Sequence, residues 1–202
     1  MQQSALKHVV TVDTSQPIWE RFFMVSPLVL VGTREDDGGY DFAPKHMVIP
    51  LSWENYVGFV CIPRHGTYRN SKRTAAFTIS YLRPSQVLEA NLAAAPRCED
   101  DRKTSLEAVK KFPATKIDGM FVEDGYLYLE CEVDRIIDGF GENSLIVGHI
   151  IAAHVHEDCL RDEEQDDQDL IHASPLLAYL HPGRFASIDT SRSFPFPEGM
   201  KK

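Results

Sequence analysis

The sequence lacks any long apolar segment. No apolar run reaches the roughly 20 residues that a membrane-spanning helix needs. The amino terminus also lacks the basic stretch followed by an apolar one that marks a secretion signal. We therefore expect a cytoplasmic protein with no membrane partner.

Cysteine is scarce and never closely paired. The four cysteines, Cys61, Cys98, Cys131 and Cys159, form no C-x-x-C motif, which argues against a zinc ribbon and against a dense disulfide framework. Cys61 and Cys131 lie in apolar, strand-like runs, where cysteine usually packs as a small hydrophobic residue. We expect four reduced thiols and no cysteine nucleophile.

Positive charge is in short supply, since 21 Lys and Arg face 30 Asp and Glu and the formal net charge is −9. Such a balance argues against a general nucleic-acid partner. The sequence also has no G-x-G-x-x-G motif, no P-loop, no nucleophile elbow and no paired-carboxylate motif. His154 and His156 alternate on one predicted strand, but two histidines without a placed third ligand are a weak metal signal, and we expect no metal site.

Short β-rich runs, bounded by proline, glycine and charged residues, are what the sequence does contain. A hairpin signal lies at 35–39, and Gly148 among β-branched residues favours a bent strand over a helix. In the segment 126–133, Glu130 and Glu132 share one face, which predicts a half-exposed strand. The expected strands are 27–33, 57–62, 77–82, 126–133 and 145–156.

Helical segments are few, and they do not alternate regularly with the strands. We expect helices at 67–74, at 85–95 after Pro84, and at about 101–112 before Pro113, with the acidic run 157–169 a solvated loop. A doubly wound parallel sheet would need a helix after nearly every strand. The pattern predicts a mainly β, antiparallel barrel with a few inserted short helices. We expect one domain over 1–202, with a core at about 25–185 and a C-terminal tail at 186–202.

The segment 64–73, RHGTYRNSKR, is a basic island in an acidic chain. It follows the predicted strand 57–62 directly, and Thr67 is suited to cap a short helix there. A helix amino terminus offers unpaired N–H groups and a positive dipole end, so it binds phosphate readily. A capped surface helix with solvated charges is the alternative interpretation.

Thr67 and Asn70 in this island match a Thr-x-x-Asn segment, and here the sequence resembles the flavin reductase family. In that family the segment holds the phosphate of flavin mononucleotide (FMN). The resemblance extends from about residue 25 to residue 185. It implies a split β-barrel fold and a homodimer with the flavin in a cleft between the subunits.

Two further segments carry the same resemblance. Ala43 and Pro44 fit a loop, Asn-x-Ala-Pro-x-Ser, that borders the isoalloxazine ring in the family, whereas Asp41 and His46 depart from it. Asn143 replaces a histidine that often lies near the flavin or nicotinamide. The cofactor-binding residues that the resemblance implies are Thr33, Ala43, Pro44, Lys45, His46, Cys61, Pro63, Arg64, Thr67, Asn70, Lys72, Arg73 and Asn143.

Three functions remain open at this point. The first is an NAD(P)H:flavin oxidoreductase that uses FMN, or FAD, and supplies reduced flavin or electrons to an oxygenase or another acceptor protein. The second is an FMN-binding electron carrier that does not use nicotinamide, a hypothesis that Asn143 keeps open. The third is a metal-dependent hydrolase built on the histidine-rich strand, which the basic island disfavours.

Overall fold

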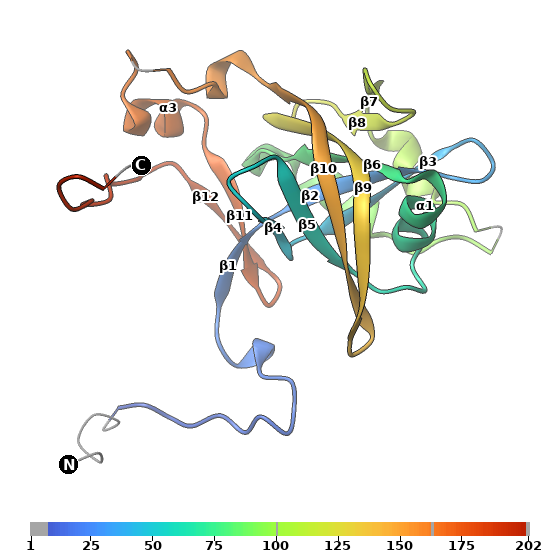
Figure 1. Cartoon of the computed structure of the whole chain (residues 1–202), viewed down its shortest axis with the longest axis horizontal. Coiled ribbons are helices and arrows are strands. Elements are labelled where there is room, and N and C mark those ends of the chain that lie inside the picture. The colour runs from blue at the N-terminus through green and yellow to red at the C-terminus, as the bar shows by residue number, and fades with distance from the viewer. Residues whose placement is uncertain (1–7, 100, 163, 201–202) are drawn as a thin grey trace.

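A seven-stranded antiparallel sheet dominates the computed structural model, which describes residues 8–99, 101–162 and 164–200. Its strands curl into an open barrel in the order β3-β2-β6-β9-β10-β5-β4 (Figure 1). This confirms the predicted mainly β, antiparallel split barrel. The strands are β2 (Val29–Arg34), β3 (Tyr40–Lys45), β4 (Val48–Pro50), β5 (Tyr56–Cys61), β6 (Ala76–Tyr81), β9 (Leu127–Phe140) and β10 (Asn143–Val155).

The inner face of this sheet carries the main hydrophobic core. Phe59 and Phe77 are buried there with an edge-to-face contact at 5.1 Å between ring centroids. Gly148 lies against Phe77, since a Cβ added at the glycine would stand 2.4 Å from the ring. The register of β10 against β9 shifts between Val147 and Gly148. The bent strand expected at 145–156 is therefore present, and the glycine permits the bend where the aromatic ring comes close.

Two smaller sheets complete the strand architecture. β1 (Met24–Pro27), β11 (Leu176–His181) and β12 (Arg184–Ile188) form one, and β7 (Lys111–Pro113) and β8 (Met120–Val122) form the other. The single strand expected at 27–33 is divided at Leu28, because β1 pairs with β11 whereas β2 pairs with β3 and β6. The chain passes from one sheet to the other at that residue.

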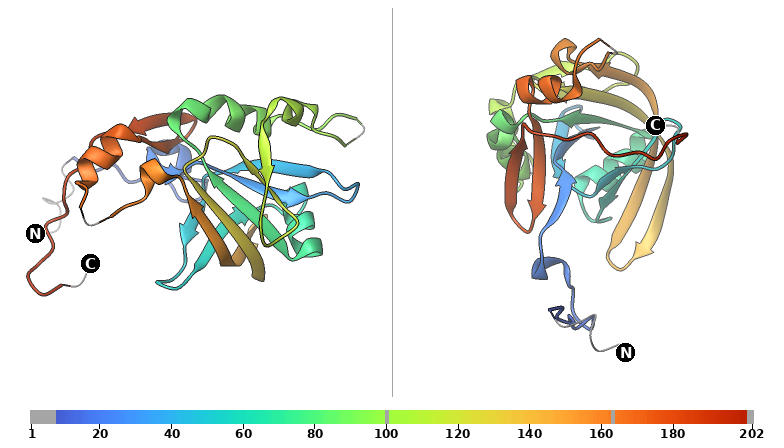
Figure 2. Two further views of the ribbon diagram at one scale, coloured as in Figure 1. Left: turned by 90° about the horizontal axis from the view of Figure 1, so that it is seen from above. Right: turned by 90° about the vertical axis from the view of Figure 1, so that its left-hand side faces the viewer.

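The helices are short and lie between strands, as Figure 2 shows from two sides. The predicted helix 67–74 is confirmed as α1 (Gly66–Thr74), and 85–95 corresponds to a 3-10 turn, η3 (Pro84–Gln86), followed by α2 (Val87–Ala94). The remaining helical segments are α3 (Asp167–Ala173) and the 3-10 turns η2 (Trp19–Arg21), η4 (Thr104–Ala108) and η5 (Glu157–Cys159). Among the described residues, no helix is long and apolar enough to cross a membrane.

The helix expected at 101–112 is wrong. Asp101 has φ +61°, in the left-handed region, so it cannot lie within a right-handed helix. Only η4 is helical, and Phe112 belongs to strand β7, where its ring packs on Phe121 at 5.3 Å. The packing of this ring across the β7–β8 hairpin outweighs the local helical pattern.

The acidic run 157–169 is not a continuous loop either. It begins with η5 and ends in the first turn of α3. The Asp166 side chain accepts hydrogen bonds from the N–H groups of Gln168 and Asp169, which makes it the N-cap of α3. The acidic composition therefore serves a helix start in addition to solvation.

Glu130 corrects the expectation of a uniformly exposed glutamate face on β9. Glu132 is exposed, but Glu130 is fully buried, because the loop between β7 and β8 covers the strand at that point. Its carboxylate accepts hydrogen bonds from the N–H groups of Thr115, Lys116 and Ile117 at 2.6–3.1 Å. The charge is thus buried together with a full set of donors.

A second apolar cluster lies on the opposite side of β2 and β3, where α2 and η4 cover the sheet. Leu30 and Phe42 pack there with Ala90 and Ala93 of α2 and with Leu106 of η4. Because α1 contacts the same two strands, the end of β3 lies between α1 and the segment that follows α2. This arrangement positions the cavity described next.

Candidate flavin site

A cavity of about 510 Å³ lies where β3, the amino end of α1 and the chain after α2 meet. Its volume is within the range of small-molecule sites. Five of the residues expected to hold a cofactor border it: Ala43, Pro44 and Lys45 of β3, with Arg64 and Thr67 at α1. Asp41, one of the noted departures from the family loop, borders it as well. The complete lining consists of Asp41, Ala43, Pro44, Lys45, Arg64, His65, Gly66, Thr67, Arg69, Ala93, Ala94, Ala95, Pro96, Arg97, Asp101 and Lys103.

The amino end of α1 opens onto this cavity. His65 is the N-cap in extended conformation, and its side chain makes no capping hydrogen bond. Thr67, which the sequence suggested as the cap, lies inside the helix and is buried. The first N–H groups of a helix, here those of Gly66 and Thr67, have no partner within the helix. An anion in the cavity would therefore meet both free donors and the positive end of the helix dipole.

Positive side chains surround the same helix end. Lys45, Arg64 and Arg69 border the cavity together with His65. The pKa of His65 lies below its ordinary value, because partial burial disfavours the charged ring and the positive charges of Lys45, Arg64, Arg69 and Lys103 oppose its protonation. The four neighbouring cations themselves, and not the shift in pKa, make the helix end favourable for an anion.

Asp41 is the one buried acid in the cavity wall, and two cations hold it. Its carboxylate accepts a hydrogen bond from Lys103 Nζ at 2.9 Å and lies 3.2 Å from an Arg97 nitrogen. The same Arg97 also pairs with Glu35 and lies 3.8 Å from Asp101. Asp41 departs from the family pattern, and the structure supplies the reason that the departure is tolerated: its charge is offset within the protein.

The end of β3 and the residue that follows it lie in two different environments. Ala43, Pro44 and Lys45 border the cavity, whereas the His46 ring stacks on the rings of Tyr179 and His181 at 4.7 and 5.4 Å. Burial, followed by the charges of His181 and Lys45, lowers the pKa of His46. His46 thus joins the main sheet to the β1-β11-β12 sheet.

Thr33 and Asn70 face each other beneath the cavity and do not line it. Asn70 Nδ2 donates to Thr33 Oγ1 at 3.2 Å, and both residues are buried. This bond ties α1 to β2. The Thr-x-x-Asn segment is therefore divided, with Thr67 at the cavity and Asn70 under it.

Lys72 and Arg73 lie in the last turn of α1 and are not among the residues that line the cavity. Arg73 forms an ion pair with Asp36 at 2.5 Å, and the Lys72 ammonium lies 5.8 Å from the centre of the Tyr68 ring. Their basic charge belongs to the outer face of the helix.

Cys61, Pro63 and Asn143 are not among the residues that line the cavity. Cys61 ends β5 and pairs in register with Ser144, so Asn143 lies beside the chain that leads from β5 to α1. Burial raises the pKa of the Cys61 thiol, although Lys45 nearby acts in the opposite direction. The thiol is therefore protonated at neutral pH, as expected for a packing residue.

Arg97, Lys103 and the end of α2 were not identified from the sequence. Lys103 lies 62 residues from its partner Asp41, and no local motif links them. His65, Gly66 and Arg69 fall within the basic island and could have been selected from it. The three alanines at the end of α2 carry no chemical signal at all.

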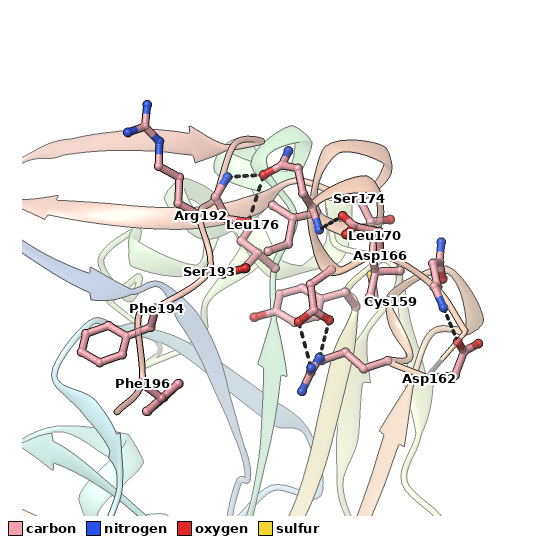
Figure 3. Close-up of a pocket in the computed structure, with 17 residues that line it drawn as sticks. Cys159, Asp162, Asp166, Leu170, Ser174, Leu176, Arg192, Ser193, Phe194 and Phe196 are labelled. Carbon is pink, nitrogen blue, oxygen red and sulfur yellow. Dashed lines mark hydrogen bonds and ion pairs between the residues drawn. The ribbon is translucent and has the colours of Figure 1, made fainter. Parts of the chain in front are cut away.

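A larger cavity, of about 1030 Å³, lies under α3 and the C-terminal tail (Figure 3). It contains none of the expected cofactor-binding residues, and α3 and α1 lie at opposite ends of the molecule (Figures 1 and 2). Arg161 and Arg192 both border it, and Arg161 is paired with Asp167 at 2.8 and 2.9 Å. Phe194 and Phe196 of the tail border it, with their rings 4.8 Å apart.

The side chains of His154 and His156, at the end of β10, each contact a carboxylate at hydrogen-bond distance. His154 Nε2 lies 3.0 Å from Glu130 Oε1, and His156 Nδ1 lies 2.7 Å from Asp158 Oδ1. Within the ranges that the structure describes, no three His, Cys, Asp or Glu side chains gather so that they could hold a metal ion.

The donors around the smaller cavity fit the phosphate end of a flavin nucleotide. They combine free helix N–H groups with Lys45, Arg64 and Arg69, which is the donor set that phosphate requires. The backbone of residues 43–45 at the same cavity could border a flat, hydrogen-bonding ring. The chemistry of the site thus agrees with the resemblance noted in the sequence.

Comparison with known proteins gives the same family. The family model of the flavin reductase like domain matches residues 21–188. No curated protein matches the sequence. Among solved structures, 2-nitrobenzoate 2-nitroreductase of Pseudomonas fluorescens has a TM-score of 0.78 at 16% identity, over 96% of this chain and 98% of that one.

Two other solved structures are similar in fold. Flavoredoxin of Desulfovibrio vulgaris (Miyazaki F) has a TM-score of 0.76 at 20% identity, over 95% of this chain and 100% of that one. Nitrilotriacetate monooxygenase component B from Bacillus cereus has a TM-score of 0.77 at 15% identity, over 92% and 98% of the two chains. Because the family model covers most of the chain, and these structures share its fold throughout, the chain belongs to the flavin reductase like domain family.

Proposed function

We propose that this protein is an FMN-binding oxidoreductase that transfers electrons from NADH or NADPH to flavin. The observation that carries the proposal is the cavity at the amino end of α1, where free helix N–H groups and Lys45, Arg64 and Arg69 converge. This donor set suits a terminal phosphate, and family membership supplies the flavin as the molecule that bears it.

The residues would divide the work of holding the cofactor. Gly66 and Thr67 of α1 would bind the phosphate, and the backbone of residues 43–45 would border the ring. Lys45 lies where it could stabilise negative charge on the ring. The flavin, when bound, supplies the hydride and electron chemistry, so the chain needs no nucleophile of its own.

An oxygenase is the acceptor that we propose for the reduced flavin. A structure of similar fold is component B of a monooxygenase, and another is the flavin reductase component of a two-component tryptophan halogenase. An electron carrier is the second candidate, favoured by Asn143 in place of the family histidine and by the similar fold of a flavoredoxin. In that case the flavin would exchange electrons with a protein and not with nicotinamide.

We further propose that the protein acts in the cytoplasm as a homodimer, with residues 1–202 forming one domain. The proposal of a dimer is supported by large apolar side chains at the surface of β1 and around β4. Val25 is 69% exposed, and Trp53 is fully exposed. Large exposed apolar patches commonly mark protein–protein contacts.

Titration of the purified protein with flavins tests the central claim. We expect quenching of flavin fluorescence with FMN and a yellow complex after removal of free ligand. Under anaerobic conditions, stopped-flow absorbance should then show that NADH or NADPH bleaches the bound flavin. A protein that binds no flavin would refute the function. Flavin that dithionite reduces but millimolar NADH and NADPH do not would favour the carrier.

The Asn143→His variant tests whether the missing family histidine slows reduction of the bound flavin by NADH or NADPH. Asn143 starts β10 beside the chain that leads to the cavity, so a histidine there would restore the family pattern. We expect faster bleaching by nicotinamide with unchanged FMN affinity. If bleaching does not accelerate, the missing histidine is not what limits hydride transfer.

A further inference from the structure

Residues 8–23 form an arm that covers no part of its own chain. The arm precedes β1 and extends away from both sheets (Figures 1 and 2). None of its residues is buried. Its hydrogen bonds are local, such as the one that the Arg21 N–H donates to the Ile18 carbonyl within the 3-10 turn η2. The arm therefore contributes nothing to the hydrophobic core of the chain that carries it.

The arm nevertheless carries large aromatic side chains. Trp19, Phe22 and Phe23 are 53%, 42% and 65% exposed. The rings of Trp19 and Phe22 contact each other edge-on, with centroids 6.3 Å apart. Aromatic side chains contribute much of the free energy of protein–protein interfaces when they are covered. Three of them in one extended segment therefore indicate a docking element.

An apolar surface lies at the sheet edges beside the arm. In β4, Val48 is buried whereas Ile49 is 57% exposed, and alternate residues on either side of Ile49 continue the exposed row. β1 adjoins this row, because Met24 pairs with His181, whose ring stacks on His46 just before β4. The exposed apolar side chains of β1 and of the β4 row form an edge patch, which consists of Met24, Val25, Met47, Ile49, Leu51 and Trp53.

The arm and the edge patch together expose about as much apolar surface as a dimer needs. A covered aromatic side chain buries roughly 150–250 Å², so the exposed parts of the three arm rings and Trp53 amount to on the order of 500 Å² per chain. The aliphatic side chains of the patch supply most of the remainder of the roughly 800 Å² that a standard interface takes from each partner. Methionine sulfur also makes favourable contacts with aromatic rings, which suits Met24 and Met47 to receive them.

We propose that the arm of each copy packs on the edge patch of a second copy, so that the two chains exchange their arms across a twofold axis. The arm enters β1 at Met24, which itself belongs to the patch, and it continues beyond the sheet edge without turning back over it (Figure 2). A twofold axis beside Met24 brings each arm onto the other chain, because an isologous contact occurs twice. This inference rests on the proposed homodimer and names the segment that joins its two copies.

The two tryptophans of the chain report on the two sides of this contact. Trp19 lies in the arm and Trp53 in the edge patch, and both are exposed in the single chain. The Phe22→Asp, Phe23→Asp variant should be monomeric by light scattering at micromolar concentration, with an unchanged circular dichroism spectrum because the arm lies outside the core. Relative to this variant, we expect the wild type to emit at shorter wavelength and to be quenched by acrylamide at least three-fold less. In a Trp19→Phe background, the emission of Trp53 alone should still respond to the two arm substitutions.

The Leu88→Asp, Leu160→Asp variant is the matched control. The two leucines are 65% and 58% exposed and lie outside both the arm and the edge patch. This variant also adds two charges in place of two large apolar side chains, but we expect it to remain dimeric with wild-type tryptophan emission. If it dissociates as the arm variant does, added charge and not the arm controls association, and the proposal fails.

Chemical cross-linking separates exchange between chains from an arm that folds back on its own chain. Trp19→Cys and Ile49→Cys are made in separate chains, each with Cys98→Ser because Cys98 is the exposed native cysteine of the described residues. After subunit exchange, a bifunctional maleimide should link the mixture into a covalent dimer in much higher yield than either variant alone. With both cysteines on one chain, exchange again predicts linked dimers, whereas an arm that folds back would give linked monomers and would overturn the proposal.

The outcomes also distinguish the exchange from the homodimer on which it rests. A wild type that is monomeric would refute the dimer and the exchange together. A dimer that survives Phe22→Asp, Phe23→Asp, in a protein whose mixed cysteine variants do not cross-link, would overturn the exchange and leave the homodimer standing.

Discussion

Single residues in this protein separate into those that face the candidate ligand and those that hold them in place. Thr67 borders the cavity, whereas Asn70, one helical turn away, is buried under it with Thr33. The resemblance assigned both residues to the phosphate. The geometry gives them different tasks, and these have different experimental signatures.

Thr67→Val should weaken FMN binding about ten-fold with little change in riboflavin binding or stability. The substitution removes a hydroxyl at the cavity and keeps the volume, and a hydrogen bond to a charged group is worth roughly 1.5–3 kcal/mol. Asn70→Ala should instead lower the free energy of unfolding by about 1–3 kcal/mol, because Thr33 Oγ1 loses its buried partner. Flavin titration and urea denaturation of the two variants check this. Identical effects of the two variants on both ligands would contradict the division.

At the scale of helices and strands, sequence patterns predicted the elements whose signals lie within their own residues. Strands β5 and β6 and helix α1 coincide with the expected segments within a residue at each end. The signals for them are local: apolar β-rich runs, the proline and glycine residues that bound these runs, and the residues suited to a helix end. Strand β7 could not be found in this way. Its Phe112 is fixed by ring contacts at 5.3 Å with Phe121 of the paired strand β8 and at 5.1 Å with Tyr128 of β9, and no run of consecutive residues specifies either contact.

The candidate site shows the same division. The basic island identified the amino end of α1, since all of its residues are neighbours in the chain. The Asp41–Lys103 pair could not be identified, because it forms only when the sheet and the segment after α2 come together. His46 was expected at the ring, but the stacking of its ring on β11 depends on a separate sheet that no local pattern specifies.

The loop between β7 and β8 depends on Glu130 of β9, and this predicts a pH-dependent stability. Burial would raise the pKa of Glu130, but hydrogen bonds from Thr115, His154 and Lys116 outweigh it and lower the pKa to about 2. The unfolded value is near 4.5. Because the folded pKa is lower, the unfolded state binds the proton more readily, so this contribution is full above pH 4.5 and disappears as the pH falls through 2.

Glu130→Gln should therefore destabilise the protein by about 3 kcal/mol at pH 7, and the difference from the wild type should shrink as the pH approaches 2. The amide nitrogen of glutamine would also face the N–H groups of Lys116 and Ile117, which need an acceptor. Urea denaturation at several pH values measures both effects. Glu132→Gln, on the same strand but exposed, is the control and should match the wild type. A gap between Glu130→Gln and wild type that does not shrink between pH 7 and pH 2 would contradict the assignment.

At the scale of the whole molecule, exposed apolar side chains gather at two of the sheet edges. β1 is an edge of the three-stranded sheet, and β4 is an edge of the seven-stranded one. They are neighbours, because Met24 of β1 pairs with His181 and the His181 ring stacks on His46, just before β4. Residues 8–23, before β1, extend away from both sheets (Figures 1 and 2). The exposed apolar side chains of this edge patch are Met24, Val25, Met47, Ile49, Leu51 and Trp53, and Trp19, Phe22 and Phe23 are exposed in the segment before β1.

A monomer would leave this edge patch in water and two strand edges unpaired, an arrangement that invites association. We therefore expect a dimer by light scattering at micromolar concentration. The Val25→Asp, Trp53→Asp double variant should be monomeric with an unchanged circular dichroism spectrum, because the new charges would be buried in the interface. Leu88→Asp is the control: Leu88 is 65% exposed on α2, outside the patch, and its variant should remain dimeric.

Flavin binding by the monomeric variant shows whether the cofactor lies between the subunits or within one of them. If the cofactor lies between subunits, the monomeric variant should lose FMN affinity, whereas a wild type that is monomeric and still binds FMN tightly would exclude an interface site.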